Sequence, residues 1–131
     1  MNDEIKLRES TEENAPVVFE EMVDQLAKDG DEIIASLTAA KAHLLHMVVG
    51  VSGEAGELLD AVKKHVIYTK DIDLENVIEE LGDLEFFMQG IRGTLGISRE
   101  ETIQANIAKL RDRYQGLKYS DAAAQQRADK Q

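Results

Sequence analysis

Two apolar stripes with heptad spacing constrain the fold of this chain more than any other feature. In each stripe, apolar side chains recur at steps of 4, 3, 4, 3 and 4 residues. This period places them along one face of an α-helix. The first stripe is Leu44, Val48, Val51, Ala55, Leu58 and Val62, and the second is Val77, Leu81, Leu84, Met88, Ile91 and Leu95. A connection of only a few residues, 67–72, separates them, so we predict an antiparallel helical hairpin.

Capping residues and glycines predict where the other helices begin and end. Asp73 suits the N-cap of the second hairpin helix, and Gly96 suits its C-terminal end. Ser98 and Glu101 have the spacing of a capping box, which begins a last helix that runs to about Tyr114. The fold class is therefore all-α, a helical hairpin with flanking helices that resembles a four-helix bundle.

Upstream of the hairpin we expect a short amphipathic helix that starts near Pro16 and stops at Gly30. A long helix should follow from about Glu32 to Val66. It contains Gly50, Gly53 and Gly56, each of which costs about 1 kcal/mol relative to alanine. These glycines indicate either close approach of another helix or a local break.

The chain of 131 residues suits one domain, with a flexible segment over 1–15, a helical domain over 16–116 and a polar tail over 117–131. Its formal net charge of −11 disfavours nucleic-acid and membrane partners. It has no cysteine, no secretory signal and no apolar run near the roughly 20 residues of a membrane span. We expect a cytoplasmic protein. Two apolar stripes exceed what one hairpin buries, which favours a homodimer or homotetramer.

Acidic residues repeat at i, i+3 on both hairpin helices. Glu54 and Glu57 lie one turn apart on the first, and Glu80 and Asp83 lie one turn apart on the second. Helical arithmetic places both pairs on the same side of their apolar stripes and equally far from the connection. We therefore expect the four carboxylates at one height on one side of the hairpin, beside its seam. Glu79 points near Asp83 and is a candidate fifth member.

Four clustered carboxylates repel one another unless a cation is present, although a single acidic pair is more often a solvated helix face. Hard oxygen ligands favour Mg²⁺, with Mn²⁺ as an alternative. A ferritin-like di-iron site requires Glu-x-x-His, which is absent. A calcium loop near Asp71 lacks its turn glycine and its final glutamate.

Several basic residues are candidate substrate ligands. Lys63 and Lys64 could reach phosphate, although lysines near a helix end are also ordinary partners of the helix dipole. Asn106, Lys109 and Arg113 share one face of the last helix, which suits base and phosphate contacts or equally a solvated basic face.

The motifs resemble those of the MazG-like all-α nucleoside triphosphate pyrophosphohydrolases. GEAGELLDAVKK followed by EELGDLEFF carries the family's Glu-x-x-Glu and Glu-x-x-Asp, with HLLHMVVGVSGEAGEL before and NIAKLRDRY after. The resemblance implies cleavage of a (deoxy)nucleoside triphosphate between the α- and β-phosphates. It implies Mg²⁺ bound by Glu54, Glu57, Glu80 and Asp83. It also implies Lys109 and Arg113 as phosphate ligands and Asn106 as a sugar or base contact.

The attacking water needs a base, for which Glu57 and Glu79 are the candidates. The expected role is removal of noncanonical nucleotides. Two alternatives stay open. One is a phosphoribosyl-ATP pyrophosphohydrolase, and the other is a noncatalytic helical interaction module.

Overall fold

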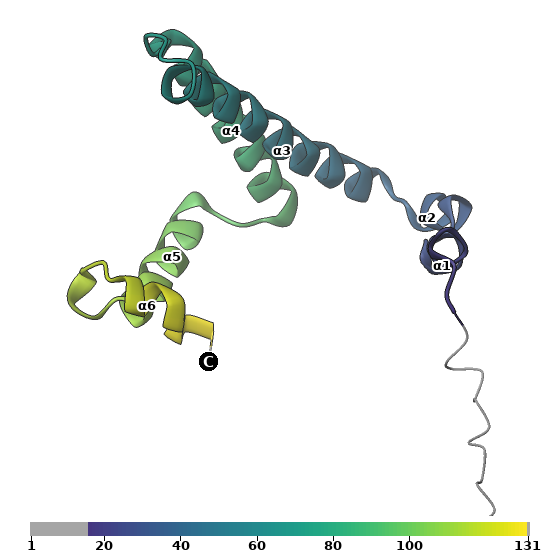
Figure 1. The fold of residues 1–131 in the computed structure, drawn as a ribbon. Coiled ribbons are helices and arrows are strands. Elements are labelled where there is room, and N and C mark those ends of the chain that lie inside the picture. Colours follow the sequence, from purple (N-terminus) through teal and green to yellow (C-terminus); the bar gives the residue numbers. More distant parts are fainter. Residues whose placement is uncertain (1–15, 131) are drawn as a thin grey trace, which may run out of the picture. The chain divides into compact units, whose positions relative to one another are not determined.

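The computed structural model describes residues 16–130, which form helices and no strands (Figure 1). The all-α fold class is confirmed. The predicted flexible segment 1–15 lies outside the described residues. None of the described helices is both long and apolar enough to cross a membrane. The elements are α1 (Phe19–Leu26), α2 (Gly30–Ser36), α3 (Ala39–Val66), α4 (Leu74–Leu95), α5 (Arg99–Arg113), η2 (Gln115–Leu117), α6 (Asp121–Gln126) and η3 (Ala128–Lys130).

The chain divides into two compact units, and the first ends at Leu37. Its described part contains α1 and α2. The prediction that Gly30 stops a helix is wrong, because Gly30 is the first residue of α2. The Asp29 carboxylate caps that helix by accepting from the backbone N–H groups of Asp31 (2.8 Å) and Glu32 (3.2 Å).

The second unit begins with α3 at a break that the sequence analysis missed. A single helix from Glu32 to Val66 was predicted, but α2 ends at Ser36 and α3 begins at Ala39. Thr38 has an extended backbone, and its hydroxyl accepts from the Lys41 N–H at 3.2 Å. A capping hydroxyl here satisfies the first turn of α3.

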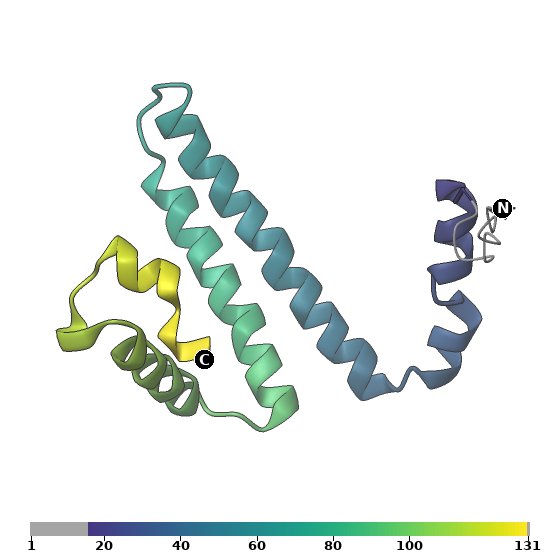
Figure 2. The ribbon, with the colours of Figure 1, turned by 60° about the horizontal axis from the view of Figure 1, so that its bottom comes forward.

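The hairpin of α3 and α4 is confirmed, and its two long helices run side by side in opposite directions (Figure 2). The Asp73 carboxylate caps α4 by accepting from the Asn76 N–H at 3.1 Å. Gly96 ends α4 in the left-handed conformation, with φ at 67°. The capping box of Ser98 and Glu101 begins α5 as predicted.

The face by which α3 and α4 pack differs from the predicted one. Met47 and Ala61 are the most buried hydrophobic side chains of the described residues, at 7% and 5% exposed. Several residues of the predicted stripes are instead exposed, namely Val48, Ala55, Val62, Leu81 and Leu95. Others are half-buried as expected, namely Leu44, Val51, Leu58, Val77, Leu84, Met88 and Ile91. The seam is therefore rotated toward Met47 and Ala61.

Two reciprocal contacts explain this rotation. On α3, a Cβ at Gly50 would overlap the ring of Phe87, and on α4 a Cβ at Gly90 would overlap the Met47 side chain. Each glycine thus receives a large side chain from the opposite helix. Gly50 fits the predicted close approach, and α3 is continuous through it.

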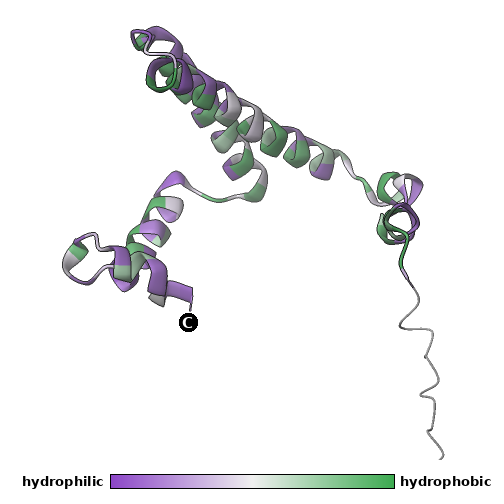
Figure 3. Cartoon of the chain, in the orientation of Figure 1, coloured by the Kyte–Doolittle hydropathy of each residue, from purple (hydrophilic) through white to green (hydrophobic). Residues whose placement is uncertain are grey.

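A second set of apolar side chains stays exposed along the hairpin, and apolar residues recur along both helices in Figure 3. They are Leu45, Val49, Leu59 and Val66 on α3, and Leu74, Ile78 and Phe86 on α4, together with the exposed residues of the predicted stripes. The hairpin therefore has more apolar surface than its own seam covers.

Candidate metal centre

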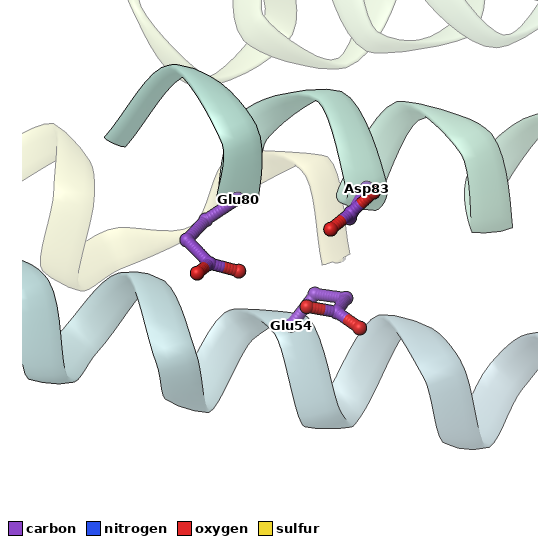
Figure 4. Close-up of side chains that lie close together, drawn as sticks. All are labelled: Glu54, Glu80 and Asp83. Carbon is purple, nitrogen blue, oxygen red and sulfur yellow. The ribbon is translucent and has the colours of Figure 1, made fainter. Parts of the chain in front are cut away.

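Three carboxylates from the two hairpin helices converge at one place (Figure 4). Glu54 belongs to α3, whereas Glu80 and Asp83 belong to α4 and lie one turn apart. Each offers an oxygen atom, and these atoms all lie within 4.8 Å of one another. Glu54 and Glu80 are half-buried, and Asp83 is exposed. We call these three residues the acidic group.

Glu54 and Glu80 lie in the seam rather than beside it. The half-buried positions of α3 run through Val51, Glu54 and Leu58, at steps of 3 and 4. On α4 they run through Val77, Glu80 and Leu84. The rotation of the seam thus brings one carboxylate of each helix into the interface. The heptad spacing had predicted only apolar side chains there.

The electrostatics of the acidic group are unfavourable without a cation. The pKa of Glu80 is raised, first by partial burial, then by a hydrogen bond with the Glu54 carboxyl and by the charges of Glu54, Glu57 and Asp83. Four cations that form ion pairs, Lys63, Lys64, Arg92 and Arg113, pair with Asp60, Glu85 and Asp129 rather than with the acidic group. These four cations therefore do not neutralise the negative charge of the acidic group.

The donor set fits a hard divalent cation. Carboxylate oxygens are the preferred protein ligands of Mg²⁺ and Mn²⁺. With metal–oxygen distances of about 2.1 Å, ligand oxygens around Mg²⁺ lie roughly 3–4 Å apart. The oxygens of Glu54, Glu80 and Asp83 need only small side-chain movements to reach that spacing. No histidine joins this group among residues 16–130, which disfavours a nitrogen-rich transition-metal site.

Two further predicted residues lie outside the acidic group. Glu57 is exposed on α3, and it is close enough for its charge to raise the pKa of Glu80. Glu79 is exposed on α4 and is not among the grouped carboxylates of the described chain. A metal-binding role for Glu57, and a catalytic role for either residue, stay predictions.

Lys64 has a carboxylate partner that the sequence analysis did not consider. Its ammonium pairs with Asp60 at 2.7 Å, and Lys63 pairs with the same carboxylate at 3.0 Å. These pairs raise the pKa of both lysines, and the charge of Glu57 adds to the effect on Lys64. Asp60 precedes Lys64 by four residues, so helical i, i+4 spacing was the signal available.

The three predicted substrate ligands of α5 lie in one helix, where Asn106 and Lys109 are exposed and Arg113 is half-buried. No hydrogen bond or ion pair in the described chain links them to the acidic group. Arg113 instead binds Asp129, with its Nε donating at 2.7 Å and its Nη2 at 2.9 Å to the two carboxylate oxygens. Sequence reasoning missed Asp129, because it lies in the segment predicted as a polar tail.

The family model for the MazG nucleotide pyrophosphohydrolase domain matches residues 43–117, which is more than half of the 131-residue chain. The matched range includes the acidic group, Glu57 and Arg113, and it ends before Asp129. No curated protein and no solved structure matches the chain.

Proposed function

The chain belongs to the MazG nucleotide pyrophosphohydrolase family, and from this premise we propose that it hydrolyses nucleoside triphosphates. Water would add across the anhydride between the α- and β-phosphates of a (d)NTP, giving a (d)NMP and pyrophosphate. The observation that carries the proposal is the convergence of Glu54, Glu80 and Asp83 from two helices within the matched region. Nothing else in that region combines carboxylates of opposite helices in this way among the described residues.

We propose that Glu54, Glu57, Glu80 and Asp83 hold Mg²⁺. When bound, Mg²⁺ supplies positive charge that offsets the charge of the triphosphate and of the transition state. Glu54 and Glu80 would fix the ligand geometry, because both are half-buried in the seam. Asp83 and Glu57 are more exposed and suit the side that faces the substrate.

The remaining roles follow from chemistry and from family membership. Glu57 or Glu79 would accept the proton of the attacking water at a carboxylate oxygen. Lys64, Asn106, Lys109 and Arg113 would bind substrate. Because Lys64 lies about two turns after Glu57 on α3 and is affected by its charge, it suits a phosphate near the acidic group. The proposed cellular role is removal of noncanonical nucleotides in the cytoplasm.

The exposed apolar side chains of the hairpin support a homodimer or a homotetramer. Leu59, Ile78 and Phe86 each expose about two thirds of their surface. Large apolar patches of this kind are uncommon on monomers and usually mark an interface. A second hairpin packed on this surface would complete a four-helix bundle, which is the arrangement expected for an isologous dimer.

A panel of substrates tests the proposed activity. The full chain is incubated with Mg²⁺ and with each canonical dNTP and NTP, several modified nucleotides and phosphoribosyl-ATP, and products are separated by anion-exchange chromatography. Monophosphate and pyrophosphate should appear, and EDTA should stop their formation. Preference for phosphoribosyl-ATP would favour the alternative enzyme. A noncatalytic module would give no product from any substrate and no specific Mg²⁺ binding by calorimetry.

A further inference from the structure

A cavity of about 400 Å³ lies between the C-terminal end of α5 and the segment that follows it. Two cationic side chains, Arg113 and Lys118, contribute to its wall, and Asp112 is the acidic residue that faces it. The other polar lining comes from Gln115, Ser120 and Gln126. In a chain with a net charge of −11, a cavity lined by two cations, one carboxylate and amide groups differs from its surroundings and suits an anion.

The guanidinium of Arg113 has donors left for such an anion. An arginine carries five N–H groups, and Asp129 accepts from one on Nε and one on Nη2. The opposite edge of the guanidinium, with both N–H groups of Nη1, is not used by Asp129. A side-chain hydrogen bond also links Arg113 and Tyr114. Because Arg113 lines the cavity, we assign to the anion the N–H groups that neither Asp129 nor Tyr114 uses.

Asp129 holds this guanidinium in a fixed orientation. Its side chain is only 2% exposed, and that of Arg113 is 18% exposed. The Arg113 guanidinium lowers the pKa of Asp129 to about 2, so the carboxylate stays charged at neutral pH. A bidentate pair restricts the rotation of an arginine more than a single hydrogen bond does.

The segment that carries Asp129 is itself folded back onto α5. The Ser120 hydroxyl caps α6 by accepting from the Ala123 N–H at 3.1 Å, and Gly116 turns the chain with φ at 66°. The rings of Tyr114 and Tyr119 are in contact, with centroids 5.7 Å apart. The Arg113–Asp129 pair then ties the C-terminal end of this segment to α5.

We propose that this cavity binds a phosphate-class oxyanion through Arg113 and Lys118, and that Asp129 is the positioning residue that holds Arg113 for it. The identity of the anion rests on the proposed function, since a pyrophosphate group is both part of the substrate and a product. The C-terminal segment, beyond the family match, would therefore complete an anion site.

Direct binding tests the cavity without turnover. Sodium pyrophosphate is titrated into Mg²⁺-free full-length protein and followed by calorimetry and by the Nε–Hε signal of Arg113 in ¹H–¹⁵N NMR. We expect saturable binding that shifts this signal. Lys118→Gln should weaken binding about tenfold, and Lys130→Gln, with the same charge change on the same segment, should not. Absent binding, or equal binding by both variants, would overturn the cavity assignment.

Two charge-matched aspartate variants test positioning. Asp112→Asn and Asp129→Asn each remove one negative charge near the cavity. If only the electrostatic field mattered, both would tighten pyrophosphate binding. Positioning predicts that Asp112→Asn tightens it whereas Asp129→Asn weakens it about tenfold. Tighter or unchanged binding by Asp129→Asn would overturn the positioning role.

The fold of the segment is monitored by the NOE between the rings of Tyr114 and Tyr119. If Asp129→Asn abolishes that NOE, Arg113→Lys replaces it, because lysine keeps the charge and loses the bidentate fork. Weaker pyrophosphate binding by Arg113→Lys is expected, and unchanged binding contradicts the proposal.

Kinetics then separate this inference from the proposed function. If the oxyanion belongs to the nucleotide, Lys118→Gln should raise KM for the preferred substrate with little change in kcat. If it is free pyrophosphate, KM should stay constant and product inhibition should weaken. Pyrophosphate binding without hydrolysis of any nucleotide would contradict the proposed function alone. If the protein hydrolyses a nucleotide but Lys118→Gln changes neither KM nor inhibition by pyrophosphate, the anion site alone is contradicted.

Discussion

The acidic group of the hairpin and the Arg113–Asp129 pair of the C-terminal segment place the same chemical group in opposite electrostatic settings. Glu80 is half-buried beside other carboxylates, and its pKa is raised. Asp129 is nearly inaccessible yet bound by a guanidinium, and its pKa falls to about 2. Burial alone raises the pKa of a carboxyl group, so the neighbouring charge decides the direction at Asp129.

This difference separates a site that needs a ligand from one that is complete. When the fold disfavours the ionised form of a carboxylate, the protein loses folding free energy. A bound cation restores that stability. A carboxylate paired with arginine already has its counter-ion. The acidic group thus has the character of a binding site, whereas Asp129 has that of a support for the residue it holds.

Glu80→Gln should have the largest effect. We expect turnover to fall at least about a hundredfold, because a central ligand is lost. In Mg²⁺-free buffer the same variant should unfold at an equal or higher temperature, since it removes a repulsive charge. Initial rates of pyrophosphate release and thermal unfolding by circular dichroism measure the two effects.

Glu75→Gln is the matched control, because it removes the same charge from the exposed first turn of α4. It should retain near wild-type turnover. A Glu80→Gln protein that is destabilised and fully active would contradict the assignment of the acidic group as a binding site, since Glu80 would then be a structural residue.

Gly50→Ala should have an intermediate effect, because it should displace the acidic group and leave the C-terminal segment unchanged. The added Cβ would overlap the Phe87 ring, so α3 and α4 must separate and Glu54 must shift relative to Glu80. Overpacking of this kind costs about 1–3 kcal/mol. Denaturant unfolding should show that loss, and Mg²⁺ affinity should weaken.

Gly53→Ala provides the contrast on the same helix. Nothing lies within 4 Å of a Cβ at Gly53 in the described structure. Alanine is favoured over glycine in a helix by about 1 kcal/mol, and Gly53 is exposed, so this variant should be stabilised. Equal effects of the two substitutions would contradict the assigned seam.

Local signals made the ends of α4 and the start of α5 predictable, whereas the seam between α3 and α4 depends on long-range packing. Asp73, Gly96 and the Ser98 capping box act within one turn, so the sequence contains everything that fixes them. The rotation of α3 against α4 depends on Phe87 meeting Gly50 across the hairpin. Periodicity cannot report it, because α3 carries apolar residues on more than one face.

The candidate site shows the same division. The spacing of Glu54, Glu80 and Asp83 predicted their convergence, since two helices of known direction fix which turns meet. Asp129 was not predictable in this way. Its partner lies 16 residues earlier, and the intervening short helices depend on a left-handed glycine at 116 and on tyrosine contacts.

The pH dependence of the C-terminal segment should be the smallest effect, and its sign follows from Asp129. Its pKa is about 2 when folded and near the ordinary 3.8 when unfolded, so between these values the unfolded chain binds more protons. The stabilisation of the folded segment by the Arg113–Asp129 pair is therefore complete above about pH 4 and is lost as the pH falls toward 2.

The protection of the α6 amides against hydrogen exchange, relative to their intrinsic exchange rates, should fall over this range in wild type. Asp129→Asn should lack this component, whereas the capping carboxylate of Glu101, whose pKa is also lowered, contributes equally to both proteins. Identical pH profiles for the two proteins would mean that the pair does not hold the segment, and Asp129 would then be unable to position Arg113.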